Sequence, residues 1–106
     1  MVFSIGVNQM KNGIKFKAGQ FYLTRGVNDR IAHDEEFAKF VLHSLRRHLH
    51  GDWGDLCPED KRENQFSLDK YLRLFSAYIN PKNDEKIWII TEADRTATTV
   101  LFPEEY

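Results

Sequence analysis

The feature that most constrains this chain is an apolar stripe with the period of an α-helix. Between residues 35 and 50, large apolar side chains recur at every fourth position, at Phe37, Val41, Leu45 and Leu49. This spacing places them on one helical face. Asp34 is suited to the N-cap, and Gly51 to the position after the last turn. The pattern predicts a helix over 35–50 whose apolar face must be covered by another part of the protein.

The second half of the chain carries strand patterns separated by short turns. Residues 87–91 and 96–102 are rich in β-branched and aromatic side chains, and the polar stretch between them suits a hairpin loop. Residues 71–79 fit either a strand or a helix, and we prefer a strand because a turn at 80–84 leads directly into the next one. Connections this short cannot hold the crossover of a parallel βαβ unit. We therefore expect an antiparallel meander.

The N-terminal region gives weaker signals. Apolar residues alternate near the start of the chain, Asn12-Gly13 is typical of a turn, and short strand-like segments follow at 14–17 and 21–25. A hairpin-like arrangement is predicted there. Residues 28–34 are expected to form a polar connection, and residues 58–66 a surface helix or an irregular loop.

Composition agrees with a globular domain, because the 106 residues are 42% hydrophobic and 29% charged. The patterns together predict one α+β domain over 1–106. Its antiparallel sheet of three to five strands, with a C-terminal meander, packs against one main amphipathic helix. No run approaches the ~18 apolar residues of a membrane span, and the start of the chain does not resemble a secretory signal. The single cysteine, Cys57, cannot form an internal disulfide. We therefore expect a cytoplasmic protein that does not bind a membrane.

The charges are unevenly divided. Residues 1–50 contain eight Lys/Arg and four Asp/Glu, a balance of +4, whereas residues 51–106 contain seven and twelve, a balance of −5; the net charge is −1. A compact fold would bring the halves together to neutralise each other, which is the favoured interpretation. The alternative is a surface with one basic and one acidic flank for a charged partner. The basic clusters are sparse and no nucleic-acid-binding motif is present, so no specific nucleic-acid partner is predicted.

The sequence gives little support for a metal site or a catalytic nucleophile. His43 and His48 lie about 140° apart around a helix, so they do not share a face, and a single cysteine cannot build a multi-cysteine zinc site. We expect the histidines near the end of helix 35–50 to serve as neutral or cationic groups beside its C-terminus. Cys57 precedes Pro58 without the flanking signature of a cysteine hydrolase. No metal and no cofactor are predicted.

Two polar segments are the best candidates for a binding site. Residues 24–29 follow an expected strand and contain Arg25 and Asp29, and residues 91–96 join two expected strands and contain Asp94 and Arg95. Sites are often carried on such loops, although turn chemistry alone explains many Asp and Asn residues.

Trp53 lies between two Gly-Asp pairs. It is either a core plug at the end of helix 35–50, which we favour, or a surface anchor beside these loops. Arginine is enriched among interface anchors. If Arg95 is such an anchor, its removal is expected to weaken partner capture and to change stability little.

Several segments resemble one family of small bacterial proteins: LTRGVND at 23–29, EFAKFVL at 36–42, GDWGDLC at 51–57, and KIWIITEADR at 86–95 followed by TTVLFP. The resemblance covers roughly residues 20–106. Family members look like plasmid-, phage- or mobile-element-associated proteins, often labelled plasmid-related protein or type I restriction endonuclease M subunit. A methyltransferase needs a glycine-rich cofactor loop and an Asn-Pro-Pro-aromatic motif, and Asn80-Pro81-Lys82 is the nearest segment to the latter. The resemblance implies an accessory role in a mobile element and supplies no catalytic residues.

Two functions of different classes are consistent with these observations. The leading hypothesis is a non-enzymatic interaction module of a mobile genetic element that binds a bacterial or phage protein. A sharper version of this hypothesis is an inhibitor of a host defence system. The alternative is an enzyme, such as a small nucleic-acid-processing protein, that uses the Arg and Asp residues of the two polar loops in one shared cleft.

Overall fold

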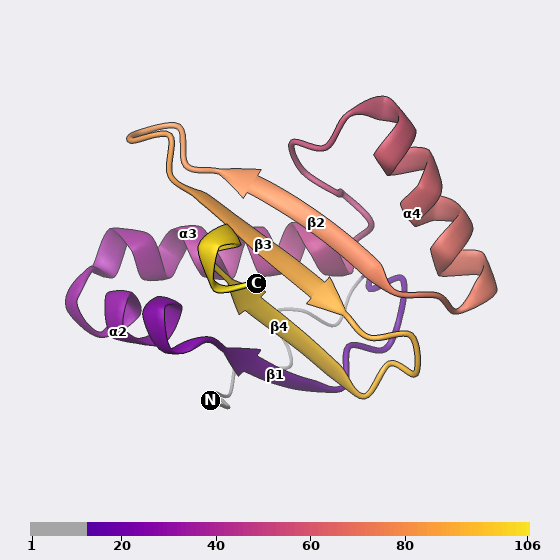
Figure 1. The fold of residues 1–106 in the computed structure, drawn as a ribbon, viewed down its shortest axis with the longest axis horizontal. Helices are drawn as coiled ribbons and strands as arrows, with labels where there is room; N and C mark the ends of the chain where they lie inside the picture. The colour runs from indigo at the N-terminus through magenta and orange to yellow at the C-terminus, as the bar shows by residue number, and fades with distance from the viewer. Residues whose placement is uncertain (1–12) are drawn as a thin grey trace.

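The computed structural model describes residues 13–106 and shows three α-helices beside a four-stranded sheet (Figure 1). The elements follow in the order β1 (Gln20–Leu23), α2 (Arg25–His33), α3 (Glu35–Leu49), α4 (Pro58–Lys70), β2 (Leu74–Ile79), β3 (Lys86–Thr91), β4 (Ala97–Leu101) and the 3₁₀ turn η1 (Pro103–Glu105). The strand order across the sheet is β1-β4-β3-β2. The fold is therefore α+β, as predicted.

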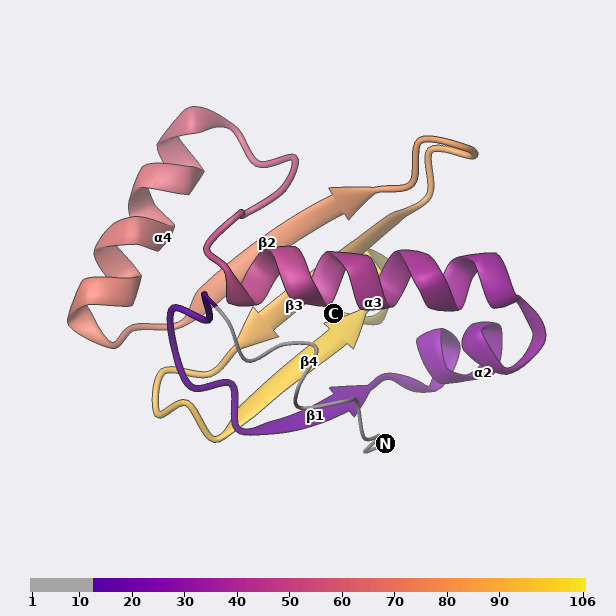
Figure 2. The ribbon, with the colours of Figure 1, turned by 180° about the vertical axis from the view of Figure 1, so that it is seen from behind.

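Helices α2 and α3 lie on one face of the sheet, and η1 lies on the other (Figures 1 and 2). The core forms between α3 and that sheet face, where Phe37, Val41, Leu45 and Leu49 are all at most 2% exposed. They pack against strand residues that alternate inward, such as Leu23, Ile87, Ile89 and Val100. This confirms the predicted helix and the side that it buries.

The ends of α3 follow from its capping residues. The Asp34 carboxylate accepts a hydrogen bond from the Phe37 amide at 3.0 Å, which satisfies one of the unpaired donors of the first turn. Gly51 follows the helix with φ +78°, a conformation that glycine adopts without steric cost.

The sheet is mixed, which corrects the expectation of a purely antiparallel one. Strands β2, β3 and β4 form the predicted antiparallel meander, but β1 pairs in parallel with β4. The turn-length argument was sound for strands that follow one another along the chain. It could not bear on β1 and β4, because most of the chain, including all three helices, separates them.

The other N-terminal expectations have mixed outcomes. The strand expected at 21–25 is present as β1, but no strand forms at 14–17, and residues 1–12 lie outside the described part of the chain. Residues 25–33, expected as polar loop and connection, form α2. Its first turn is capped from the far end of the chain, because the Glu105 carboxylate accepts from the Gly26 amide at 2.8 Å and from the Thr24 hydroxyl at 2.5 Å. No local sequence signal could show that cap.

The outer edge of β2 is covered by side chains and loop backbone instead of another strand. The Asn64 side chain of α4 donates to the Phe75 carbonyl and accepts from the Phe75 amide. The loop before α4 continues this cover, since the Asp55 amide donates to the Ala77 carbonyl at 2.7 Å and the Asp55 carboxylate accepts from the Ile79 amide. Covering an edge in this way prevents its pairing with another chain.

The division of charge is partly internal, as the favoured interpretation holds. Arg30 pairs with Glu85 at 2.7 Å, and Arg47 pairs with Asp52 at 2.8 Å; each pair joins a cation of the basic half to a carboxylate of the acidic half.

We expect Leu45→Ala to lower the free energy of unfolding by about 2–5 kcal/mol, because Leu45 is fully buried between α3 and the sheet. Urea titration followed by circular dichroism measures the change. His43→Ala on the exposed side of the same helix is the matched control and should have little effect. Equal stability of Leu45→Ala and the wild type would contradict the placement of α3.

Candidate functional site

The two polar segments singled out in the sequence do not meet. Arg25 and Asp29 are exposed on α2, which starts beside the end of β1 where Leu23 pairs with Val100. Arg95 precedes β4 at the opposite end of the same strand pair, where Gln20 pairs with Ala97. A cleft shared by the two segments, as the enzyme hypothesis requires, is therefore not formed.

Trp53 is a core residue. It is 4% exposed and contacts two other rings, lying 6.2 Å from Phe16 in a stacked arrangement and 5.7 Å from His48 edge-on. The favoured prediction of a plug at the end of the helix is confirmed, and the ring is not available as a surface anchor.

Arg95 is held in an unusual way. It has φ +61° and is only 6% exposed, yet no carboxylate of the described residues pairs with it. Its Nη1 atom donates to the carbonyl oxygens of Leu72 at 2.7 Å, Glu92 at 3.1 Å and Ala93 at 3.3 Å, and Nη2 lies 3.4 Å from the Ser67 carbonyl. Burial lowers the pKa of Arg95 from its ordinary value.

These contacts give the Arg95 side chain a structural role. It ties the β3–β4 turn to the last turn of α4 and to the segment that leads into β2. The carbonyl groups at a helix C-terminus carry partial negative charge, so they compensate part of the buried positive charge. The Nε atom remains buried and without a hydrogen-bond partner.

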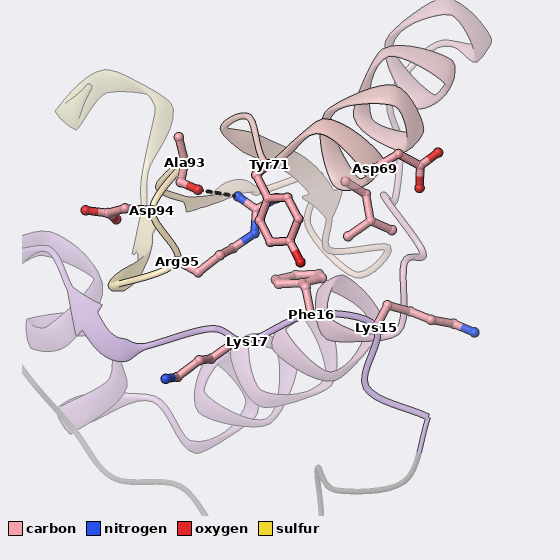
Figure 3. A pocket seen from close by; sticks show the side chains of 9 residues that line it. Lys15, Phe16, Lys17, Asp69, Tyr71, Ala93, Asp94 and Arg95 are labelled. Atoms are coloured by element: carbon pink, nitrogen blue, oxygen red, sulfur yellow. Dashed lines mark hydrogen bonds between the residues drawn. The ribbon is translucent and has the colours of Figure 1, made fainter.

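A cleft of about 800 Å³ opens beside Arg95 (Figure 3). Three segments line it: residues 15–17 before β1, Leu68, Asp69 and Tyr71 at the end of α4, and residues 93–95 of the β3–β4 turn. The Arg95 guanidinium carbon lies 5.6 Å from the Tyr71 ring and 5.8 Å from the Phe16 ring, within the range of cation–π attraction. We call this site the Arg95 cleft.

The charged side chains of the Arg95 cleft differ in how they are engaged. Asp94 points away from Arg95 in Figure 3, and its carboxylate accepts from the Thr96 amide at 3.1 Å and hydroxyl at 2.6 Å. These hydrogen bonds lower the pKa of Asp94. Lys15 and Lys17 are exposed on either side of Phe16 and form no ion pair with the described residues.

Residues 15–17 form the floor of the cleft, and the backbone of residues 13–19 is anchored to α3 and β4. The Lys15 amide donates to the Leu49 carbonyl at the end of α3, and the Ala18 carbonyl accepts from Thr98 of β4. Gly19 has φ +70° and runs so close to the Thr96 backbone that a Cβ there would collide with it. Phe16 is consequently held between the cleft and the core, with its edge against the His48 ring at 5.3 Å.

His48 is fully buried and belongs to a hydrogen-bonded network of four side chains. Its Nδ1 atom lies 2.5 Å from the Ser76 hydroxyl and its Nε2 atom 2.9 Å from the Thr91 hydroxyl; Thr91 in turn contacts Thr98 at 2.7 Å. The Thr98 hydroxyl donates to the Ala18 carbonyl at 2.8 Å.

That last bond fixes the direction of the others. Because the Thr98 proton goes to Ala18, Thr91 donates to Thr98 and must accept from His48 Nε2–H, which leaves Nδ1 to accept from Ser76. Every hydroxyl proton in the network is used when His48 is the neutral Nε2–H tautomer.

The sequence did not predict this role of His48, because its position indicated a neutral or cationic side chain beside the C-terminus of the helix. Position 48 follows Leu45 by three residues and so shares its buried face, which was the available signal. Burial, aided by the nearby Arg95 charge, lowers the pKa of His48 to about 3. It is inaccessible as a general base for a bound ligand.

The other candidate groups are metal ligands and the cysteine. Within residues 13–106, no three His, Cys, Asp or Glu side chains gather where they could hold a metal ion. Cys57 is exposed at the N-cap of α4, with Pro58 in the first turn, and its side chain makes no capping hydrogen bond. No helix in the described part of the chain is long and apolar enough to cross a bilayer.

Comparisons with protein-family models, with curated proteins and with solved structures each found no match. The resemblance to mobile-element proteins stays a prediction.

We expect stability to fall with acidity because of His48. Its pKa is about 3 in the folded protein and about 6.5 when unfolded, so the unfolded state binds the extra proton between these values. The contribution is complete above pH 6.5 and shrinks as the pH falls, by about 2 kcal/mol between pH 7 and pH 5.

Denaturant titration at several pH values measures this loss. His48→Gln, which can accept from Ser76 and donate to Thr91 without titrating, should lack this component. The exposed His43→Gln is the matched control and should keep it. An equal pH dependence in the wild type and His48→Gln would contradict the buried neutral imidazole.

Arg95→Ala is expected to destabilise the protein, in contrast to the expectation from the sequence. The change removes charged hydrogen bonds to the carbonyls of three segments, so the free energy of unfolding should fall by about 1–3 kcal/mol. Arg25→Ala, which removes an exposed arginine at the other end of β1, should change it by less than about 0.5 kcal/mol. Thermal and urea denaturation of both variants test the contrast. Equal stability of the two would show that Arg95 is not structural.

Proposed function

We propose that this protein is a non-enzymatic interaction module and that the Arg95 cleft binds a partner protein. The observation that carries the proposal is a strongly exposed aromatic ring in the lining of a cleft whose cations outnumber its anions. Tyr71, in the lining, is 71% exposed. Phe16, the second aromatic ring in the lining, is half-buried. Exposed apolar patches rimmed by polar groups mark sites of protein interaction.

The charges of the Arg95 cleft favour an acidic occupant. Lys15, Lys17 and Arg95 contribute three positive charges without a carboxylate partner, and the Asp94 carboxylate is engaged by Thr96. Asp69 and Asp94 are the two anions in the lining, so its three cations leave a formal charge of +1. The occupant that fits best is a segment of a partner protein that combines acidic residues with an aromatic or aliphatic side chain, which would pack beside Tyr71.

Two observations favour binding over catalysis among the described residues. A general acid or base needs a pKa near the working pH, but the carboxylates whose pKa is shifted are all shifted downward, namely Asp34, Glu36, Asp52, Asp94 and Glu105. The second is that Arg25 and Asp29 lie at the opposite end of the sheet from Asp94 and Arg95. The alternative function, an enzyme, loses the shared cleft on which it depended.

The setting of the interaction is proposed from the sequence resemblance alone. A small protein of a plasmid or phage would bind a bacterial or phage protein, and a component of a host defence system is the partner that such an element gains most by inhibiting.

Selection from a displayed library of random peptides tests the binding site. The wild-type protein should enrich peptides that carry both acidic and apolar residues. Tyr71→Asn removes the exposed ring and suits φ +55°, so it should preserve the fold. We expect it to weaken the affinity for the enriched peptides at least about tenfold, which corresponds to about 1.4 kcal/mol.

The matched control is Ile79→Thr, which removes an exposed apolar side chain at the far end of β2. It should leave the affinity within about twofold. Peptides that bind wild type and Tyr71→Asn equally well, or that lose affinity only with Ile79→Thr, would place the docking surface elsewhere.

A further inference from the structure

The side of the Arg95 guanidinium that carries Nε and Nη2 is poorly supplied with acceptors. Nη1 is saturated by the carbonyls of Leu72, Glu92 and Ala93. Nη2 makes a single long contact of 3.4 Å to the Ser67 carbonyl. Nε, which lies on the same side of the guanidinium as Nη2, is buried and has no hydrogen-bond partner; we call these two groups the fork. A buried N–H without an acceptor costs free energy, so its persistence in a side chain that is 6% exposed calls for an explanation.

The arrangement matches what an oxyanion requires. One carboxylate can accept two parallel hydrogen bonds from the Nε–H and an N–H of Nη2, which is the bidentate geometry of arginine–carboxylate pairs. Donors preset by other contacts lose little side-chain entropy on binding. The three carbonyls on Nη1 hold this fork in place whether or not the cleft is occupied.

The Tyr71 ring packs against the Arg95 guanidinium. It lies across the guanidinium in Figure 3, at 5.6 Å from the guanidinium carbon, and Tyr71 is itself 71% exposed. A ring this exposed is restrained by few neighbours, so a rotation about its side-chain bonds can open space beside the guanidinium. Lys15 and Lys17 lie on either side of Phe16 in the lining, and in Figure 3 their ammonium groups point outward from the cleft.

We propose that the Arg95 cleft contains an oxyanion subsite, in which the Nε and Nη2 groups of Arg95 bind a carboxylate of the partner's acidic segment after the Tyr71 ring moves aside. This inference rests on the proposed function and adds the group that is recognised. An acidic side chain supplies the carboxylate, whereas a free phosphate would present the same oxygen chemistry from another source.

Nuclear magnetic resonance observes this subsite directly, through the Nε–H resonance of Arg95 in the wild-type protein. The probes are an acetylated, amidated peptide of sequence Glu-Glu-Phe-Glu-Glu-Leu, its counterpart with Gln in place of each Glu, and inorganic phosphate. We expect the acidic peptide to shift the Arg95 Nε–H resonance in a saturable manner and the Gln peptide to leave it unchanged. Phosphate should act weakly, because it lacks the apolar side chain.

Charge variants at the rim provide the second measurement without touching Arg95. Lys15→Glu combined with Lys17→Glu should weaken binding of the acidic peptide at least tenfold. Lys86→Glu, one such charge reversal on an exposed residue at the far end of β3, is the control and should leave it within about twofold.

The outcomes separate this inference from the proposed function. If the acidic and Gln peptides both bind at Tyr71 while the Arg95 Nε–H resonance does not move, the docking cleft stands and the oxyanion subsite is wrong. If neither peptide binds but phosphate shifts the resonance, the oxyanion chemistry holds, and both the peptide carboxylate and the docking of a protein segment are wrong. A shift caused equally by the charge-free Gln peptide would also overturn the subsite.

Discussion

The structure depends on keeping one imidazole neutral and fully bonded inside the core. His48 joins α3 to β2 through Ser76 and to β3 through Thr91, and the network continues to Thr98 of β4 and the Ala18 backbone. Four elements and the segment before β1 therefore share a single chain of hydrogen bonds. Because each hydroxyl has one proton, the chain has only one consistent direction. Buried polar networks of this kind stabilise a fold when every member is satisfied and destabilise it when one is not.

The same network determines where the Arg95 cleft lies. Thr98 holds the Ala18 carbonyl, and the His48 ring contacts Phe16, so residues 16–18 cannot shift without disturbing the core. Gly19 lets the backbone turn beside Thr96 and enter β1. The cleft floor is thus rigid on the side of Phe16, whereas the opposite rim, formed by Tyr71, is exposed. A ligand that enters the cleft meets a fixed floor and a movable ring.

Local patterns in the sequence were sufficient for the elements that depend on local contacts. The four-residue repeat, Asp34 and Gly51 defined α3 to within a residue, because helical periodicity and capping are short-range effects. The β3–β4 hairpin followed from β-branched runs and loop length. The parallel pairing of β1 with β4 could not be foreseen, since a four-residue strand carries no information about a partner more than 70 residues away. Helix α2 was not predicted for a similar reason, because the cap of its first turn comes from Glu105, which is distant in the sequence.

The candidate site was predictable only in part. Arg95 was singled out as an anchor on a polar loop, and it does line the cleft, but its burial and its carbonyl partners depend on α4 and β2, which approach it from elsewhere in the chain. Arg25 and Asp29 had the same sequence character and lie elsewhere. Lys15, Phe16 and Tyr71 were not foreseen as site residues, because an irregular segment and a helix C-cap give no pattern that points to a site.

Backbone conformation gives a further reason to connect the cleft with function. Three described residues other than glycine have a left-handed backbone: Tyr71, Asp84 and Arg95. Asp84 belongs to the turn between β2 and β3, where Asp is tolerated in that conformation. Tyr71 takes this conformation as the C-cap of α4 and Arg95 takes it in the β3–β4 turn, and at each position it costs about 1–2 kcal/mol relative to glycine. Their side chains pack against each other at the mouth of the cleft. Glycine or asparagine at both positions would relieve the backbone strain but would remove the tyrosine ring and the guanidinium from the cleft. Strain retained at two residues that meet in one place is characteristic of sites where the side chains are needed.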